Sequence, residues 1–158
     1  MAEISPSMQR VQEALDKSGL SLEVVELPQS TRTAQEAAIA VGCQLGQIVK
    51  SLVFRGSESD SPYLVLVSGP NRADLERVSR LVGEPVRMAD ADFVREKTGF
   101  SIGGVAPVGL PESIQTLIDR DLLQYDTIWA AAGTPRSVFS LSPDDLRQLT
   151  SGQVVSIS

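Results

Sequence analysis

The apolar positions of this chain recur at two spacings, one typical of helices and one typical of strands. Between residues 71 and 83, leucine and valine return every three or four positions, as on one face of a helix. Thr33 stands three residues before Glu36, the spacing of a capping box, which predicts another helix start. With glycine as the usual stop signal, five helices are expected: Ser5 to Gly19, Thr33 to Gly42, Asn71 to Gly83, Asp90 to Gly99, and Ser142 to Leu149.

Short runs rich in valine, isoleucine and leucine lie between these helices and predict strands. The runs 47–54 and 63–68 are separated only by the polar segment 57–62, so we expect an antiparallel hairpin. Helices and hairpins are interspersed without strict strand–helix–strand repetition, which predicts an α+β fold with a mixed, mostly antiparallel sheet. The expected strands are 22–27, 47–54, 63–68, 114–118, 127–132, 137–141 and 153–157.

The composition fits one globular domain over residues 1–158. The hydrophobic fraction is 42% and the charged fraction 22%, close to the globular average. No run approaches the roughly 18 apolar residues of a membrane span, so no membrane partner is expected. The first residues lack the basic and apolar regions of a signal peptide. The single cysteine, Cys43, has no partner for an internal disulfide, and these features together predict a cytoplasmic protein.

Two absences narrow the chemistry. The chain has no histidine, which excludes Ser-His-Asp and Cys-His catalysis and any imidazole zinc site. No clustered Asp or Glu spacing suggests a carboxylate metal site, so neither a metal nor a cofactor is expected. The net charge is −6 without an obvious basic stripe, which speaks against DNA binding. Any contact with nucleic acid should be small and local.

Lys50 is the first candidate for chemistry. Alternation along 47–54 places Lys50 on a strand whose two faces are otherwise apolar, so the strand should be covered on both sides. An ammonium in a partly apolar pocket is a strong point charge for an ester or anionic oxygen. Alternatively, Lys50 lies at a strand end and reaches water. The strand pattern does not decide between these interpretations.

Two loops are further candidates, and each has a structural alternative. The glycine-rich segment 99–109 can expose N–H groups to a ligand, although a tight turn explains the same glycines and is favoured when the loop is taken alone. The small residues of 130–137 suit a narrow pocket wall or, more simply, close packing, and Arg136 in this segment can meet a phosphate. Ser51 is adjacent to Lys50, but neighbours on a strand point to opposite faces, which speaks against a Ser-Lys dyad.

The order of these segments resembles the YbaK / prolyl-tRNA-synthetase-associated editing domain family. The similarity runs from about Ser5 to about Leu149, and it is the order and spacing of the motifs that carry it. One branch of the family has asparagine after the lysine and a histidine in the late loop, whereas this chain has Ser51 and no histidine. The resembling segments are 33–38, 47–54, 64–69, 103–109 and 131–133.

The resemblance implies a single domain whose sheet is partly closed into a barrel and flanked by helices. It implies a trans-acting deacylase, metal-independent, that hydrolyses the ester of mischarged tRNA, often tRNA(Pro) carrying alanine or cysteine. The partners that the resemblance implies are a tRNA acceptor end with its amino acid and prolyl-tRNA synthetase. The family's lysine falls on Lys50 as the catalytic residue, and the substrate-binding residues would be Ser51, Gly103, Gly104, Pro107, Ala132, Gly133 and Thr134.

The mechanism expected from this resemblance is electrostatic. Lys50 and backbone N–H groups at Gly103 and Gly104 would hold the ester carbonyl or the terminal phosphate. No side chain is an evident general base, so the ribose 2′-hydroxyl or the substrate side chain would assist. The alternatives are a catalytically silent module that binds an aminoacyl-tRNA end or a nucleotide, and an esterase for small aminoacyl esters.

Overall fold

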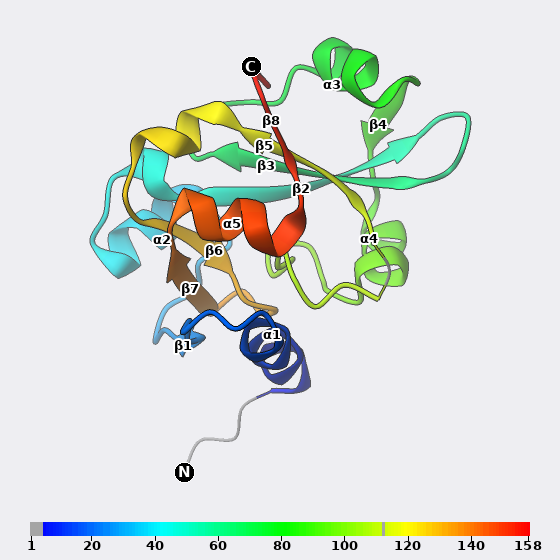
Figure 1. Cartoon of the computed structure of the whole chain (residues 1–158). Coiled ribbons are helices and arrows are strands. Elements are labelled where there is room, and N and C mark those ends of the chain that lie inside the picture. Colours follow the sequence, from blue (N-terminus) through cyan, green and yellow to red (C-terminus); the bar gives the residue numbers. More distant parts are fainter. Residues whose placement is uncertain (1–4, 112) are drawn as a thin grey trace.

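The computed structural model describes residues 5–111 and 113–158, and these residues form two open sheets with helices around them (Figure 1). Residues 1–4 lie outside the described part, and the expectation that the chain does not start with a signal peptide depends partly on them. The larger sheet has the strand order β4 (Val86–Met88), β2 (Val49–Gly56), β3 (Pro62–Ser68), β5 (Gln115–Asp119) and β8 (Gln153–Val155). The smaller sheet has the order β1 (Val25–Glu26), β7 (Ser137–Leu141) and β6 (Ile128–Ala131).

The strand pairing confirms the predicted hairpin and the α+β class. β2 and β3 are antiparallel, with Lys50 opposite Val67 and Ser51 opposite Leu66. β3 pairs with β5, and β5 with β8, in parallel, whereas the remaining pairs are antiparallel. The larger sheet is therefore mixed, as the sequence predicted, and the smaller sheet is antiparallel, so antiparallel pairs predominate among the named strands.

The expected barrel is wrong: within residues 5–111 and 113–158 neither sheet closes. β4 pairs with β2 only over Phe54–Gly56, and just before the other end of β2 an isolated bridge joins Ile48 to Trp129 of β6. The chain leaves β4 at Met88 and enters a helix, so within the described residues no strand pairs with the edge of β2 between these two contacts. The two sheets part there.

Five α-helices follow the capping signals of the sequence closely. The side chains of Ser5, Thr33, Asp90 and Ser142 each accept a hydrogen bond from the backbone N–H three residues on, and these predicted N-caps are confirmed. The third helix begins after Asp74, later than the sequence suggested. The helices are α1 (Pro6–Lys17), α2 (Ala34–Val41), α3 (Leu75–Val82), α4 (Ala91–Thr98) and α5 (Pro143–Thr150).

Several short elements differ from the sequence expectation. The strand expected at 22–27 is reduced to Val25–Glu26, and Leu45–Gln47 forms a 3-10 turn before β2 begins. The strand β4 and the 3-10 segment Arg120–Gln124 were not predicted. β4 has one buried residue in three, so it carries too little alternation to be seen in sequence.

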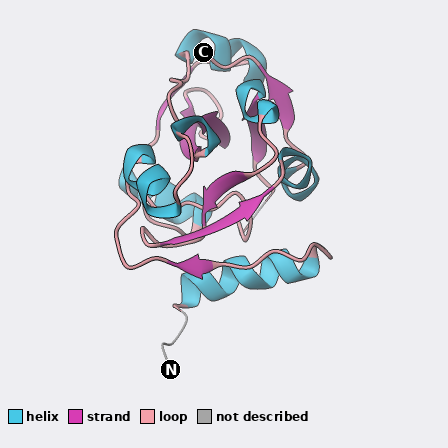
Figure 2. Ribbon diagram, turned by 90° about the vertical axis from the view of Figure 1, so that its left-hand side faces the viewer, coloured by secondary structure: helices cyan, strands magenta, loops and turns pink. Residues whose placement is uncertain are grey.

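The apolar side chains form layers on both faces of the larger sheet. One face of β2, through Val49 and Val53, joins the main core with α1, α4 and β6. The other face, through Phe54, packs with Val78 of α3 and Ile157. β2 is thus covered on both faces, as predicted. Figures 1 and 2 both place α1 at the end of the molecule that carries β1.

The β2–β3 hairpin is fixed by one carboxylate, that of Glu84, from the short connection between α3 and β4. Glu84 accepts from the backbone N–H groups of Glu58 and Ser59, each at 2.9 Å. It also accepts from the Ser59 hydroxyl and from the Tyr63 hydroxyl, each at 2.5 Å. These hydrogen bonds lower the pKa of Glu84 from 4.5 to about 2, because every one of them favours the ionised form.

Candidate functional site

A cavity of about 640 Å³ opens where the two sheets part. Its walls come from the uncovered edge of β2, from Trp129 to Ala131 of β6, and from Val138 of β7. The start of α2, the segment Gly69–Arg72 and the loop around Gly103 complete the rim. The cavity is therefore built by segments that are far apart in sequence.

Lys50 and Ser51 both line this cavity although they are neighbours on a strand. Adjacent strand residues point to opposite faces of a sheet, and Ser51 shares its face with Val49 and Val53 of the main core. The cavity runs along the edge of β2, so side chains from both faces reach it. The structure thus explains how one site can use two consecutive residues without bringing their side chains together as a dyad.

Lys50 is half-buried and its ammonium is held in place. Its Nζ donates a hydrogen bond to the backbone carbonyl of Asn71 at 2.5 Å. Burial lowers the pKa of Lys50, the nearby charge of Arg72 lowers it further, and the charge of Asp119 opposes both. A lysine with a lowered pKa at a cavity is a candidate for electrostatic chemistry.

The carbonyl that receives Lys50 belongs to a residue that is itself anchored. The side-chain amide of Asn71 donates to Asp119 at 2.9 Å and to Asp121 at 2.7 Å. Asp119 is 1% exposed and also accepts from the backbone N–H groups of Ser68 and Asp121, both at 3.0 Å. This network fixes the segment that follows β3, and with it the position of the Lys50 ammonium.

Ser51 brings an unused polar group to the cavity. Its hydroxyl oxygen is buried and has no hydrogen-bond partner among the described residues. A buried polar atom without a partner is uncommon in folded proteins and often marks a binding site. In the sequence, only the family resemblance points to Ser51 as a site residue.

The glycine-rich loop is divided between the cavity wall and the packing behind it. Gly103 lines the cavity with φ at +93°, a conformation that favours glycine. Gly104 is buried, and a Cβ there would lie 2.9 Å from the Cα of Thr134. Gly104 therefore lets the glycine-rich loop pack against the segment around Thr134. It is not among the residues that line the cavity.

The loop that follows β6, residues 132–134, lies behind the cavity wall. Ala132 is fully buried in the main core, and a Cβ on Gly133 would lie 2.7 Å from the carbonyl oxygen of Ser7 in α1. The hydroxyl of Thr134 is hydrogen-bonded to that of Ser137 at 2.5 Å. The residues of this segment that do reach the cavity are Ala130 and Ala131. Packing is thus the role that the structure gives to Ala132, Gly133 and Thr134.

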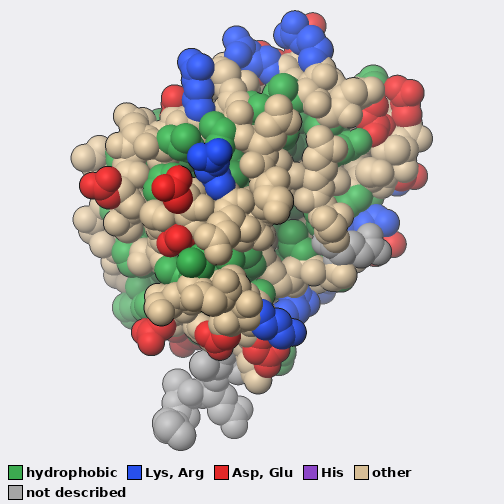
Figure 3. All heavy atoms as spheres, in the orientation of Figure 1, with side chains coloured by type: hydrophobic (Ala, Val, Ile, Leu, Met, Phe, Trp, Pro, Cys, Tyr) green, Lys and Arg blue, Asp and Glu red, His purple; other side chains and the backbone are tan. Residues whose placement is uncertain are grey.

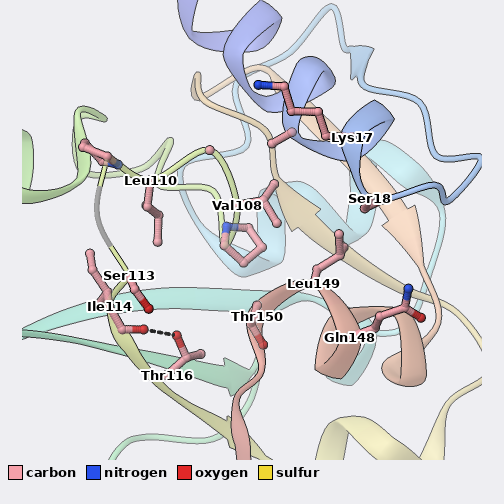
Figure 4. A pocket seen from close by; sticks show the side chains of 14 residues that line it. Lys17, Ser18, Val108, Leu110, Ser113, Ile114, Thr116, Gln148, Leu149 and Thr150 are labelled. Atoms are coloured by element: carbon pink, nitrogen blue, oxygen red, sulfur yellow. Dashed lines mark hydrogen bonds between the residues drawn. The ribbon is translucent and has the colours of Figure 1, made fainter.

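Pro107 lies at a second cavity, of about 570 Å³, between α1, α5 and the segment before β5. Figure 4 shows that the polar ends of its labelled residues do not converge, since Lys17 and Gln148 lie on opposite sides of Val108 and Leu149. The hydroxyl of Thr116 is hydrogen-bonded to the carbonyl of Ile114 at 3.0 Å. The first cavity, with Lys50 and a free serine hydroxyl, is the better candidate for chemistry.

Two arginines at the first cavity were not singled out from the sequence. Arg32 and Arg72 line it together with Lys50, and no Asp or Glu of residues 5–111 and 113–158 lines it. The Cγ of Arg32 lies 3.6 Å from the position of a Cβ on Gly103, so this side chain passes over the glycine-rich loop. Three cations without a carboxylate suit an anionic ligand, although the protein as a whole is acidic.

On the face shown in Figure 3, Lys and Arg side chains gather along the upper edge, which carries α3, and acidic side chains are scattered over the rest. Arg136, which the sequence offered as a phosphate contact, instead donates to the backbone carbonyls of Leu27 and Pro28 at 3.2 and 2.7 Å.

Residues 5–111 and 113–158 lack two features, a cluster of metal-binding side chains and a membrane-spanning helix. These residues contain no group of three or more His, Cys, Asp or Glu side chains placed to hold a metal ion. They also contain no helix that is long and apolar enough to cross a membrane.

Comparison with known proteins gives consistent matches. The sequence pattern of the family described as "Aminoacyl-tRNA editing domain" matches residues 28–149. The protein YwhH of Bacillus subtilis (strain 168), which is uncharacterised, is 33% identical over 132 residues, covering 84% of this chain and 83% of YwhH. EbsC of Enterococcus faecalis, named "Putative Cys-tRNA(Pro)/Cys-tRNA(Cys) deacylase", is 28% identical over 127 residues, covering 80% of this chain and 77% of EbsC.

A solved structure shows the same similarity in three dimensions. It is described as "a putative trans-editing enzyme for prolyl tRNA synthetase" and has 54% sequence identity to this chain and a TM-score of 0.93. The similarity covers 99% of both chains.

Proposed function

The chain belongs to the aminoacyl-tRNA editing domain family, the YbaK type, and on that premise we propose that it hydrolyses the ester of mischarged tRNA in trans. The observation that carries the proposal is the cavity at the edge of β2, where a half-buried lysine of lowered pKa lies with two arginines and with no carboxylate from the part of the chain that the structure describes. Such a cavity suits an ester flanked by phosphate. We further propose that residues 1–158 act as one editing domain, in the cytoplasm where aminoacyl-tRNA is used.

The proposed substrate is tRNA(Pro) that carries alanine or cysteine. The names of the similar proteins support it, because one refers to Cys-tRNA(Pro) and another to trans-editing for prolyl-tRNA synthetase. A narrow pocket distinguishes side chains by only about 1–3 kcal/mol per methylene, so a separate site that admits small residues is useful for fidelity. Prolyl-tRNA synthetase is the partner that this substrate implies.

Lys50 is the proposed catalytic residue. Attack on the ester turns the carbonyl oxygen negative, and a fixed ammonium beside that oxygen stabilises the charge. Gly103 and Ser51 would contact the substrate directly, since both line the cavity. The wall of the cavity would be shaped from behind by Gly104, Ala132, Gly133 and Thr134. Pro107 would hold the end of the glycine-rich loop in place. Arg32 and Arg72 would bind phosphates of the acceptor end.

The test is a deacylation screen over tRNAs charged with Ala, Cys, Ser, Thr and Pro. We expect hydrolysis above the spontaneous rate for tRNA(Pro) carrying alanine or cysteine, with the prolyl ester spared. Binding of the same tRNAs without acceleration would instead identify a silent binding module. Equal turnover of an aminoacyl-adenosine fragment would identify a small-molecule esterase.

A further inference from the structure

The backbone of Ser51 points into the cavity, because of the way β2 pairs with its neighbours. In an antiparallel pair, the N–H and C=O of a residue both face the same side, and successive residues alternate. Gly56 donates to Ser61 on the β3 side at 2.9 Å. On the opposite side, Val53 accepts from Ala89 at 3.1 Å and Ser57 donates to Pro85 at 2.8 Å. Odd-numbered residues of β2 therefore face away from β3, and Ser51 is one of them.

Within the described ranges no strand pairs with that side of β2 at Ser51, although β6 approaches it next to the bridge at Ile48. β4 pairs only with Phe54–Gly56, and the bridge to Trp129 is at Ile48. Ser51 lines the cavity, and its buried hydroxyl oxygen has no partner either. One residue thus presents a donor, an acceptor and a hydroxyl to the same space. Buried backbone groups are nearly always paired, so this edge is suited to a ligand that supplies the complementary groups.

An aminoacyl ester carries the groups that such an edge needs. Its α-amino group and its carbonyl are attached to one Cα, as in a single residue of a strand, and opposed residues in an antiparallel pair can exchange two hydrogen bonds. We propose that the aminoacyl group docks on Ser51 as a one-residue extension of the sheet. The α-amino group donates to the Ser51 carbonyl, and the Ser51 N–H donates to the ester carbonyl. This inference rests on the proposed function.

The pairing gives Ser51 a role in the reaction as well as in binding. Water adds its oxygen to the ester carbonyl carbon, the bond from that carbon to the ribose oxygen breaks, and one water proton ends on the ribose oxygen. The carbonyl oxygen becomes negative on the way, and the Ser51 N–H is a fixed donor to it. Lys50 supplies the positive charge and Ser51 supplies the directed hydrogen bond, so two consecutive residues of β2 stabilise the same oxygen.

The pairing also determines where the substrate side chain points. Side chains of directly opposed residues in a sheet lie on the same face. An L-aminoacyl group opposite Ser51 would therefore direct its side chain to the face of Val49, where Val105 and Ala130 of the main core close the cavity. Such a wall leaves room for a small side chain. Size selection thus follows from the docking mode.

The first test compares substrates with and without the α-amino group. Alanyl-tRNA(Pro) is paired with propionyl-tRNA(Pro), and cysteinyl-tRNA(Pro) with its 3-mercaptopropionyl analogue. Each enzymatic rate is divided by the spontaneous rate of the same ester, because removal of the amino group also changes the ester's reactivity. We expect the enhancement to fall about tenfold or more, as for loss of a hydrogen bond to a charged group. Equal enhancement would overturn the docking on Ser51, whereas no enhancement on any of the four esters would overturn the proposed function.

The second test removes the N–H itself. Ser51→Pro deletes a donor that takes no part in the β2–β3 ladder, so the fold should persist. Its rate should fall by about 10²–10³, as for loss of one oxyanion donor. Ser51→Ala keeps the N–H and loses only the hydroxyl, so its loss should be smaller. A folded Ser51→Pro variant, by circular dichroism and melting, with the wild-type rate would contradict the proposal. If that variant does not fold, the substrate comparison decides.

Discussion

The ammonium of Lys50 is bound to the backbone carbonyl of Asn71, 21 positions further along the chain, at 2.5 Å. The bond joins the open edge region of β2 to the segment that follows β3. It fixes the charge at the cavity without neutralising it, because the acceptor is a carbonyl and not a carboxylate. A lysine held in this way can serve an incoming oxygen without a large rearrangement.

Lys50→Ala should leave the fold intact and remove most deacylation. Loss of one preorganised electrostatic contact costs about 10²–10³ in rate, whereas loss of a half-buried ammonium also removes a desolvation cost. Lys50→Arg should be impaired too, because a planar guanidinium does not replace a compact ammonium. The measurement is single-turnover deacylation beside a thermal melt.

Lys17→Ala, at the second cavity, is the matched control and should keep the wild-type rate. Near-normal activity of the Lys50→Ala variant would remove Lys50 from the mechanism.

Asp119→Asn should move the pH dependence of the reaction. The charge of Asp119 raises the pKa of Lys50 against the effects of burial and Arg72. Without that charge the pKa of Lys50 falls further, so Lys50 loses its proton at a lower pH and the alkaline limb of the rate profile shifts to lower pH. Asp121→Asn is the control, because Asp121 also accepts from Asn71 but is exposed. An unchanged alkaline limb in the Asp119→Asn variant would show that Lys50 does not titrate in that limb.

The parts of the fold that were predictable are those with local signals. The caps at Ser5, Thr33, Asp90 and Ser142 depend on one side chain and one N–H three residues away, so sequence spacing suffices. The β2–β3 hairpin is also local, since one short polar segment separates two apolar runs. The open sheets were not predictable, because whether β2 meets β6 depends on contacts between distant segments.

The candidate site was predictable only in part, for the same reason. Lys50 and Gly103 reach the cavity, but Ala132 and Thr134 lie behind its wall, and small side chains in sequence do not distinguish lining from packing. Arg32 and Arg72 were missed because each is a single arginine in a polar segment. A signal existed for Arg72, which follows Asn71 directly after β3, but only the structure shows that this segment reaches Lys50.

Arg32→Ala should weaken tRNA binding more than it slows the chemical step. If Arg32 contacts one phosphate, its loss should reduce the salt dependence of binding by about 0.7 in the slope of log K against log salt, the value per contact for a single strand. The measurement is a titration of tRNA at several salt concentrations beside single-turnover rates at saturation. Arg147→Ala removes one charge at an exposed ion pair with Asp144 on α5 and should leave the slope unchanged. Identical slopes for Arg32→Ala and wild type would exclude a phosphate contact at Arg32.

Deacylation should persist after exhaustive chelation. The chain has no histidine and one cysteine, and the proposed mechanism uses an ammonium and backbone donors instead of a metal. The assay uses enzyme treated with EDTA and then desalted, with tRNA folded beforehand in magnesium as the control for substrate structure. Activity that disappears with EDTA and returns with a divalent ion would contradict metal independence.

Glu84→Gln should change how the stability of the fold depends on pH. The pKa of Glu84 is lowered to about 2 in the folded state by hydrogen bonds from Ser59, Tyr63 and Glu58, against 4.5 for the free group. A group whose pKa is lower in the folded state binds fewer protons there, so its contribution is present above about pH 4.5 and is lost as the pH falls towards 2.

The variant should therefore be less stable than wild type at pH 7, and the difference should shrink as the pH falls from 4.5 towards 2. The reason is that an amide cannot accept as many hydrogen bonds as the carboxylate, whereas a protonated Glu84 in the wild type loses the same advantage. Urea unfolding at pH 7, 4.5 and 3 measures it. Glu58→Gln, in the same turn, removes one negative charge but not the shared acceptor, and it should follow the wild-type profile. A constant difference between Glu84→Gln and wild type over this range would mean that Glu84 holds the hairpin by shape and not by its charge.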